Sequence, residues 1–408
     1  MKKVKILFYI EHISREMAVI EDIVKECNLS SDEYVICSTD FFMGISKYLY
    51  SPELIITPWM YSDFCYKKLL SFPFKKRIKH LNLHHEQITN LDRLEALLPS
   101  GSAKRGQHIS WGKEFSENLK MVGIPEDDIF ITGSMRLKKD NVINSKLTLS
   151  DNYFNDLEIA EKPWILFISS YSWKSMNDEM LAKVERNGRK NVWEYQKLVN
   201  NSYHQTLQWI EEFLKQNQNI VYIYRLHPSE EKDELLTSLE LKYSYFKVVF
   251  DLPVSEWIAS ADVVDLWIST SLAEVLIMNK PVRVIRPIKL PENVEIIGFE
   301  NLDKITNFSD FANIDTSNQY NSNTGGDYMD RYYACHLNSA DETRDAIDKI
   351  FKLPSYDIDM GLLERIYYSV RESIKDIAKI LLFKTGLIRH TRLSRSMKSY
   401  FTVKENAN

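Results

Sequence analysis

Short apolar runs alternate with segments of helical period along most of the chain. In the first half, strand patterns occur at Lys5–Ile10, Tyr34–Cys37, Leu54–Ile56, His80–Leu83 and Ile129–Thr132. Helical periodicity lies between them, as at Ser14–Cys27 and Lys113–Val122. Strands that alternate with helices are typical of βαβ units, so the pattern predicts a parallel sheet covered by helices.

A polar stretch, Lys138–Glu161, interrupts this alternation and predicts a crossing between two domains. The alternation then restarts, with strands expected at Pro163–Ile168, Ile220–Tyr224, Lys247–Phe250, Val263–Trp267 and Val282–Ile285. Helices are expected at Val192–Gln216, Ser229–Leu239, Val254–Ser260 and Ser271–Met278. The second half therefore predicts a complete doubly wound α/β unit.

The end of the chain has a different pattern. Ala312–Asp330 is rich in Asn, Ser, Thr, Asp and Gly, which predicts a mobile loop or lid-like insertion. Two helices, near Ala340–Phe351 and Asp359–Leu382, are expected to end the fold. Because 408 residues exceed one ordinary core, we expect domains at 1–150 and 151–355, followed by a C-terminal helix and tail at 356–408.

The composition excludes several classes of protein. A hydrophobic fraction of 44% and a charged fraction of 27% are ordinary for a globular chain. The net charge of −5 argues against a nucleic-acid partner. Four cysteines without a CxxC pair indicate free thiols in a reducing compartment, and no Cys/His cluster has zinc-ligand spacing.

Targeting signals are not recognisable in the sequence. The apolar run that follows Met1-Lys2-Lys3 is too short for a signal peptide and lacks a small-residue cleavage site. No stretch approaches the roughly 20 apolar residues of a membrane span. We therefore expect a cytoplasmic protein.

The sharpest chemical signal is the segment 222–230, which reads Tyr-Ile-Tyr-Arg-Leu-His-Pro-Ser-Glu. The expected strand leads into Arg-x-His-Pro, and an expected helix begins at Ser229. Pro228 restricts His227 to extended backbone, which would present the imidazole beside a helix N-terminus, where phosphate binds. His227 would donate to a phosphate oxygen or protonate a leaving group. The alternative is a plain strand–turn–helix junction with an ordinary polar histidine.

Hydroxyl residues follow two other strands of the second half. Ser269, Thr270 and Ser271 come directly after a buried strand, and hydroxyls with backbone N–H groups at a helix start suit a phosphate. Glu274, one turn further on, would accept from ribose hydroxyls. N-capping by Ser269 or Thr270 explains one of these hydroxyls without a ligand. Ser169-Ser170 begins the first loop of this half. These serines would contact the donor phosphate, or the loop is simply exposed to solvent.

In the first half, His84-His85-Glu86-Gln87 follows a strand. Glu86 or His85 is a candidate general base. Metal binding is the rival, but neighbours in an extended segment alternate faces, so His84 and His85 would not converge on one ion.

The C-terminal tail is basic and amphipathic. Lys379, Lys384, Arg389, Arg392, Arg395, Lys398 and Lys404 are interspersed with apolar residues, and Glu405 is the only acid after Lys379. Such a segment can lie on an anionic membrane, so peripheral association with the inner membrane through 379–404 is one expectation. A final helix that packs back on the first domain is the other.

A series of motifs recurs in consistent order over about residues 5–290. In the first half they are His84–Gln87, Trp111-Gly112, Gly123-Ile124-Pro125 and Ile131–Arg136. In the second half they are Ile165–Ser170, Gln205–Ile210, Tyr224–Glu230, Trp267–Ser271 and Lys280-Pro281. As a series they resemble bacterial surface-carbohydrate biosynthesis proteins of capsule and O-antigen assembly.

The Arg-x-His-Pro motif is also similar to that of bacterial sialyltransferases, polysialyltransferases, Kdo transferases and teichoic-acid glycerophosphotransferases. The resemblance implies a GT-B fold: two Rossmann-like α/β domains that face each other across a cleft, an N-terminal acceptor-side domain and a C-terminal nucleotide-sugar domain. It implies that His227 contacts the donor phosphate, that Ser269–Ser271 help to bind it, and that Glu86 or His85 is the acceptor-side base. It also implies metal-independent chemistry with a cytidine-linked donor and no further cofactor.

We therefore expect a glycosyltransferase that moves a sugar from a nucleotide-activated, CMP-linked donor to a surface polysaccharide, with a glycan or lipid-linked glycan as acceptor. A glycerophosphate-type phosphotransferase with a CDP-linked donor is a close variant. A GT-B enzyme that transfers nothing, such as a UDP-sugar 2-epimerase, is the second hypothesis. A non-catalytic scaffold that docks through the basic tail is the third.

Overall fold

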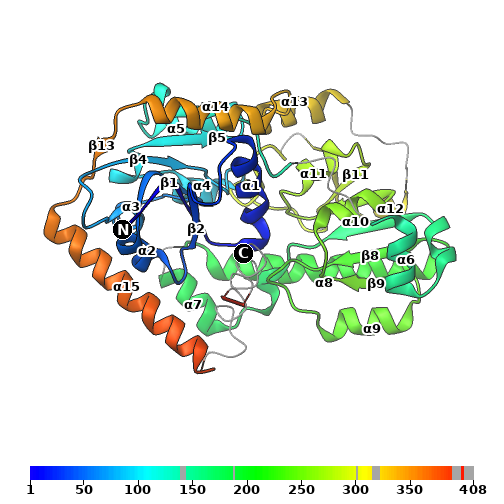
Figure 1. The fold of residues 1–408 in the computed structure, drawn as a ribbon. Coiled ribbons are helices and arrows are strands. Elements are labelled where there is room, and N and C mark those ends of the chain that lie inside the picture. The colour runs from blue at the N-terminus through cyan, green and yellow to red at the C-terminus, as the bar shows by residue number, and fades with distance from the viewer. Residues whose placement is uncertain (138–143, 187–188, 300–301, 315–321, 388–396, 399–408) are drawn as a thin grey trace. The chain divides into compact units, whose positions relative to one another are not determined.

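The computed structural model describes residues 1–137, 144–186, 189–299, 302–314, 322–387 and 397–398 (Figure 1). The chain folds into two compact units. The first comprises Met1–Gln87, Glu95–Arg136 and Asp330–Asn408, and the second comprises Ile88–Leu94 and Leu137–Met329. None of the helices in the described residues has an apolar stretch long enough to cross a membrane.

The first unit is built on a seven-stranded sheet with the order β2-β1-β3-β4-β5-β6. Its strands are β1 (Lys2–Ile10), β2 (Tyr34–Ser38), β3 (Tyr50–Thr57), β4 (Arg77–Asn82), β5 (Gln107–Ser110), β6 (Ile129–Ile131) and β13 (Tyr356–Asp357). The first six pair in parallel, and β13 pairs antiparallel with the start of β4. Apolar side chains such as those of Ile6, Leu7 and Phe8 are buried, as expected for a parallel sheet with both faces covered.

Among the described residues, helices of the first unit include α1 (Ile13–Glu26), α2 (Met43–Leu49), α3 (Asp63–Leu70), α5 (Lys113–Met121), α14 (Ser339–Lys352) and α15 (Leu362–Lys384). Helix α14 packs against α1, and α15 packs against α2 and α3. Two further helices, α4 (Leu91–Leu97) and α13 (Ser322–Tyr333), run across the sequence boundaries between the units.

The second unit is built on a six-stranded parallel sheet with the order β12-β11-β10-β7-β8-β9. The strands are β7 (Trp164–Ile168), β8 (Val221–Arg225), β9 (Phe246–Val249), β10 (Val263–Leu266), β11 (Val282–Ile285) and β12 (Lys304–Ile305). Counted from β7, this is the order 3-2-1-4-5-6 of the dinucleotide-binding Rossmann fold, which reverses between β7 and β10. The helices are α6 (Lys146–Phe154), α7 (Asp178–Arg186), α8 (Val192–Gln216), α9 (Glu234–Lys242), α10 (Val254–Ser260), α11 (Leu272–Ile277) and α12 (Phe308–Ala312).

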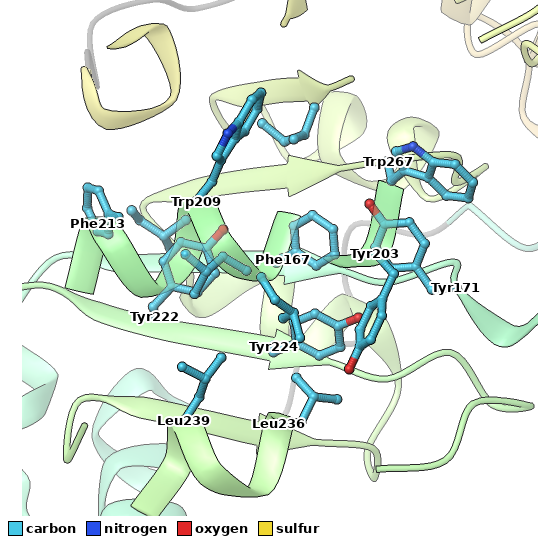
Figure 2. Packing of buried hydrophobic residues seen from close by; sticks show 14 of the residues in the cluster. Phe167, Tyr171, Tyr203, Trp209, Phe213, Tyr222, Tyr224, Leu236, Leu239 and Trp267 are labelled. Carbon is cyan, nitrogen blue, oxygen red and sulfur yellow. The ribbon is translucent and has the colours of Figure 1, made fainter. Parts of the chain in front are cut away.

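The core of the second unit is aromatic. Tyr203, Trp209 and Phe213 of α8 lie beside Phe167 and Tyr222 of the sheet, as Figure 2 shows. The Phe213 and Tyr222 ring centroids are 6.0 Å apart. These rings carry large apolar areas, and each fully buried Phe contributes about 1.5–3 kcal/mol to folding. The sheet that positions the candidate site is therefore firmly packed from one face.

The fold class predicted from the sequence, two Rossmann-like α/β units with C-terminal helices, is confirmed. The unit boundaries differ from the expected 1–150, 151–355 and 356–408. Helix α6 belongs to the second unit, where Phe154 and Trp164 lie 5.9 Å apart. From Asp330 onward the chain belongs to the first unit, where Tyr333 stacks on Trp111 at 5.8 Å.

Two predictions about irregular segments are wrong in part. Within the expected crossing Lys138–Glu161, residues 146–154 form α6. Within the expected loop Ala312–Asp330, residues 322–330 are helical in α13 because Tyr328 and Tyr332, four residues apart, are both buried. Residues 138–143 and 315–321 lie outside the described residues.

Candidate functional site

Three of the predicted motifs lie at one edge of the second sheet. Strand β7 pairs with β8 on one side and with β10 on the other, and its last residue, Ile168, is in register with Arg225 and Leu266. Adjacent strands lie about 4.8 Å apart, so the ends of β8 and β10 are separated by about two strand spacings. The Ser169-Ser170 loop therefore lies between the His227 loop and the Ser269–Ser271 loop, beside the point where the strand order reverses.

Arg225 is the last residue of β8 and is buried, with 9% of the residue exposed. One guanidinium nitrogen, Nη2, donates to the carbonyl of Leu252 at 2.9 Å. The Nε atom is buried and has no hydrogen-bond partner among the described residues. Burial lowers the pKa of Arg225, while the negative charges of Asp251 and Glu274 oppose that shift. A buried donor without a partner costs free energy of folding. Arg225 is therefore a candidate residue for binding an anionic ligand.

His227 lies in a turn that its own backbone and ring close. Its carbonyl accepts from the backbone N–H of Glu230 at 2.8 Å. Its Nδ1 accepts from the backbone N–H of Ser229 at 3.1 Å. Because Nδ1 accepts this bond, the neutral ring carries its proton on Nε2, which is then a hydrogen-bond donor.

The prediction of a helix that begins at Ser229 is wrong. Helix α9 begins at Glu234, and the Asp233 side chain caps it by accepting from the Leu236 N–H at 3.0 Å. Residues 229–233 are not part of this helix, because the Glu230 carboxylate turns into the interior of the unit. His227 is therefore presented by a turn, and the expected helix N-terminus does not adjoin it.

Glu230 anchors this turn from inside the unit. Its side chain is fully buried. The carboxylate accepts from Ser169 Oγ at 2.5 Å, from Tyr224 OH at 3.1 Å and from the His227 N–H at 3.3 Å. Lys174 Nζ lies 3.4 Å from it. Sequence reasoning assigned no role to Glu230, although it stands only two residues after Pro228 in the segment that drew attention.

The Glu230 contacts separate the two serines of the β7 loop. Ser169 is buried, and its hydroxyl is engaged with Glu230 and with Tyr224, at 2.8 Å from the latter. Ser169 thus supports the His227 turn. The Oγ atom of Ser170 is buried without a hydrogen-bond partner in the described residues, as is Nε1 of Trp267, directly after β10. With Arg225 Nε, each of the neighbouring strands β7, β8 and β10 therefore has, at or just after its last residue, a buried donor without a hydrogen-bond partner in the described residues.

The Ser269–Ser271 segment forms a turn before α11. The Ser269 hydroxyl oxygen accepts from the Ser271 N–H at 3.2 Å. Ser271 is the N-cap residue of α11 but makes no capping bond with its side chain. Thr270 is exposed, and Ser271 is half-buried. One hydroxyl oxygen is thus used by the backbone of the turn. Thr270 and Ser271 lie in the same turn, at the edge where β7 and β8 also end.

Arg286, also missed from the sequence, braces this edge. It follows β11, is fully buried and forms an ion pair with Glu295 at 2.5 Å. It also donates to the carbonyls of Trp267 and Ile285. The guanidinium therefore ties the end of β10 to the segment after β11.

In the first unit the structure separates His84 from His85 and Glu86. His84 has a left-handed φ of 47° and is fully buried. Its Nε2 lies 2.9 Å from His108 Nδ1, and His108 Nε2 lies 3.2 Å from the Lys104 carbonyl. That carbonyl only accepts, so His108 Nδ1 is the acceptor for the His84 Nε2 proton. His84 is thus a core residue.

His85 and Glu86 are both half-exposed after β4. The backbone N–H of His85 donates to the Pro58 carbonyl at 3.0 Å, and the His85 carbonyl accepts from Arg136 Nη1 at 3.2 Å. These bonds fix the segment at the carboxyl edge of the first sheet. The role of either side chain as a base stays a prediction.

Another carboxylate and histidine follow β1, next to the point where the order of the first sheet reverses. Glu11 Oε2 accepts from Trp59 Nε1 at 2.9 Å and lies 3.9 Å from His12 Nε2. Sequence reasoning did not name them. The signal was the same one used elsewhere, polar residues directly after a buried strand.

Metal-ligand geometry is not found in the described residues, where no group of three or more His, Cys, Asp or Glu side chains is arranged to hold an ion. The sequence does contain one Asp-x-Asp spacing, Asp357-Ile358-Asp359. It lies on and after β13, at the amino end of β4, away from the carboxyl edge. Asp357 pairs with Arg77 at 3.1 Å and Asp359 with Arg105 at 3.4 Å.

Comparisons with known proteins give no family. No family model matches the chain, and no curated protein matches it. Among solved structures, a putative UDP-N-acetylglucosamine 2-epimerase from Listeria monocytogenes is 10% identical, with 87% of this chain and 100% of that chain covered and a TM-score of 0.49. The wall teichoic acid polymerase TagF is 14% identical, with 85% and 89% covered and a TM-score of 0.49.

A third similar structure, Anabaena Alr3699/HepE in complex with UDP-glucose, is 13% identical, with 84% and 99% covered and a TM-score of 0.44. Identities this low assign no activity to the chain. The function must therefore be inferred from the site residues themselves.

Proposed function

We propose that the second unit binds the phosphate of a nucleotide-activated sugar and that the chain is a metal-independent glycosyltransferase with a CMP-linked donor. The observation that carries this proposal is Arg225. Its guanidinium, at the carboxyl end of β8, is buried, and Nε has no hydrogen-bond partner in the part of the chain that the structure describes. It lies beside the strand-order reversal, where α/β sheets bind ligands. A phosphate oxygen is the partner that a guanidinium fits best.

The neighbouring groups support a leaving-group role for this edge. When the bond between sugar and phosphate breaks, negative charge builds up on the phosphate oxygens. The Arg225 guanidinium, the Nε2–H of His227 and the hydroxyls of Ser170, Thr270 and Ser271 are donors suited to that charge. Donors held in place before the reaction are the largest usual source of rate enhancement.

The acceptor is activated from the first unit in this proposal. Glu86 or His85 would take the proton of an acceptor hydroxyl as the new glycosidic bond forms. The acceptor would be a growing surface glycan or its lipid-linked precursor. Neither step uses a metal ion, so we expect nucleotide binding to be unchanged by EDTA.

The three alternatives make different demands. A phosphotransferase with a CDP-linked donor would use the same donors but would break the bond between the two phosphates. A UDP-sugar 2-epimerase would turn over its nucleotide sugar without an acceptor, whereas a transferase is slow until an acceptor is added. A non-catalytic scaffold would not bind nucleotides through Arg225.

A thermal-shift panel of CMP, CDP, UDP, GDP and their sugars tests the donor. A ligand at 100 times its Kd adds about 2.7 kcal/mol of stability. We expect cytidine nucleotides to shift the melt. If UDP or GDP shifts it and cytidine nucleotides do not, the CMP-linked donor is wrong.

Variants test the site itself. Arg225→Gln keeps most of the side-chain volume but removes the charge, and we expect nucleotide binding at least about tenfold weaker by calorimetry. Arg186→Ala, an exposed arginine at the end of α7, is the control and should bind as the wild type does. Ser170→Ala removes a single hydroxyl in case Arg225→Gln does not fold. If Arg225→Gln and Ser170→Ala both leave the nucleotide affinity unchanged, the proposed pocket is refuted.

A further inference from the structure

Helix α15 of the first unit presents an apolar stripe to solvent. Six side chains at alternating spacings of four and three residues are each at least 43% exposed: Leu363, Tyr367, Val370, Ile374, Ile377 and Leu381. Spacings of three and four residues keep these positions on one face of the helix. Soluble monomers rarely leave such a continuous apolar patch uncovered, and larger ones mark interaction sites.

The opposite, polar face of α15 is the one buried against the first unit. Asp376 Oδ2 accepts from the backbone N–H groups of Gly44 at 2.6 Å and Ile45 at 3.2 Å, at the start of α2. Arg365 Nη1 donates to the Lys75 carbonyl at 2.7 Å. The hydrogen bonds of this face fix the rotation of the helix. The outward direction of the stripe therefore follows from specific contacts.

The flanks of the stripe are basic. Arg371, Lys375 and Lys384 lie on α15, and the buried Glu372 pairs with Lys375 at 2.8 Å and with Arg371 at 3.8 Å. Lys379 donates to the Asp40 carbonyl. Residues 366–408 contain nine Lys and Arg and three Asp and Glu, a net charge of +6. Since the whole chain carries −5, the remaining residues 1–365 carry −11. Positive charge is thus concentrated on and after the helix with the apolar stripe.

These features favour one kind of partner. A second copy of the chain would bring the same basic flanks together, which costs electrostatic free energy. An anionic bilayer would accept the apolar side chains at the level of the acyl chains and attract the flanking bases. None of the helices in the described residues can cross a bilayer, so this helix would lie in the plane of the interface.

We propose that α15 docks the first unit on the surface of an anionic membrane through its apolar stripe. Phe64 of α3, which is 50% exposed, extends the surface, since the Arg371 guanidinium lies 5.8 Å from its ring centroid. The sequence pointed to residues 379–404, most of which lie outside the described residues. The stripe begins earlier, at Leu363. This docking does not depend on which nucleotide the second unit binds.

Flotation of the full chain with lipid vesicles tests the proposal. We expect binding to vesicles of phosphatidylcholine with phosphatidylglycerol and much weaker binding to phosphatidylcholine alone. Binding should fall between about 0.1 M and about 1 M salt because the basic flanks are screened. The double variant Ile374→Glu with Ile377→Glu should bind at least about tenfold more weakly, because it places two acids at the bilayer.

The control is Leu241→Glu on α9 of the second unit, which replaces an exposed apolar side chain (85% exposed) by the same acid and should bind vesicles as the wild type does. Circular dichroism and melting temperature establish that the variants fold, and light scattering gives the oligomeric state. A double variant that still floats with anionic vesicles would overturn the proposal. The proposal would also be overturned if the wild type did not bind vesicles but formed a dimer that the double variant abolished. A second copy of the chain would then be the partner of the stripe.

Discussion

Glu230 is a buried carboxylate that accepts hydrogen bonds from one backbone N–H and two side chains. It joins Ser169 and Tyr224, on neighbouring strands, to the turn that presents His227. Lys174 balances its charge at 3.4 Å and pairs with Asp233 at 2.8 Å. Removal of Glu230 would leave Lys174 paired with Asp233 alone, and the buried Ser169 and Tyr224 hydroxyls would lose this acceptor. A buried polar group that loses its partner costs about 1–3 kcal/mol, and more where a charge is involved.

We therefore predict that Glu230→Ala lowers the free energy of unfolding by about 2–4 kcal/mol. Nucleotide binding should weaken as well, since His227 loses the support of its turn. Urea denaturation and calorimetry measure the two effects. Glu231→Ala, at the exposed neighbouring position, should stay within about 0.5 kcal/mol of the wild type. Equal stability of the two variants would mean that Glu230 does not anchor the turn.

The contact between α2 and α15 is the element that decides which face of the C-terminal helix is outside. The backbones approach so closely at Gly44 that a Cβ atom there would lie 2.1 Å from Ser373 N and 2.4 Å from Glu372 C. Lys47, also on α2, is fully buried and donates to the Lys68 carbonyl at 2.6 Å. Burial lowers the pKa of Lys47 to about 7, although Glu372 and Asp376 oppose this shift.

Gly44→Ala should force the two helices apart and lower the free energy of unfolding by about 1–3 kcal/mol, the usual cost of overpacking. Thermal denaturation measures this change, and faster hydrogen exchange in α15 would locate it. Gly326→Ala on α13, where nothing lies within 4 Å of the added atom, is the control. It should be neutral or stabilise slightly, because alanine favours helix. A Gly44→Ala protein as stable as the control would contradict the close contact.

At the scale of the whole molecule, the two units differ in the groups they bury. The first unit contains His80, His84 and His108, all fully buried. Burial lowers the pKa of His80 to about 3 and that of His108 to about 4, and it holds the pKa of His84 well below its usual range. These imidazoles are neutral in the folded chain at neutral pH and cannot take up a proton without a large cost.

The first unit should therefore lose stability as the pH falls below about 6.5. Between that value and about 3, the unfolded chain protonates His80 while the folded chain does not, so each pH unit costs about 1.4 kcal/mol for this histidine. Hydrogen exchange at several pH values, corrected for intrinsic rates, measures the change in each unit. His80→Gln should reduce the pH slope of the first unit.

Thr57→Val is the control for that experiment, because the Thr57 hydroxyl lies 2.8 Å from His80 Nε2. This variant removes the same hydrogen bond but no titrating group, so it should lower stability and keep the slope. A His80→Gln protein with the wild-type slope would show that His80 does not set the acid sensitivity.

Periodicity alone predicted most of the architecture. Helix α8 has the expected bounds, and strands such as β7 and β10 were found because buried parallel strands are short, continuous apolar runs. Strand β5 escaped because it reads Gln-His-Ile-Ser. Its polar side chains find buried partners elsewhere, such as His84 for His108. The residues of β5 alone could not predict these hydrogen-bond partners, because the partners come from other parts of the chain.

What the sequence by itself determined is the number and kind of the units and the residues that follow each strand. Local period and turn residues are properties of neighbouring positions, and parallel strands all end at one edge, so candidate site residues could be named. Only the tertiary structure decided which loops are neighbours, since the local pattern of residues does not determine the order of the strands in a sheet. It also decided that Glu230 turns inward, that Arg225 Nε has no hydrogen-bond partner among the described residues, and that α15 buries its polar face. Burial depends on contacts between residues far apart in the chain.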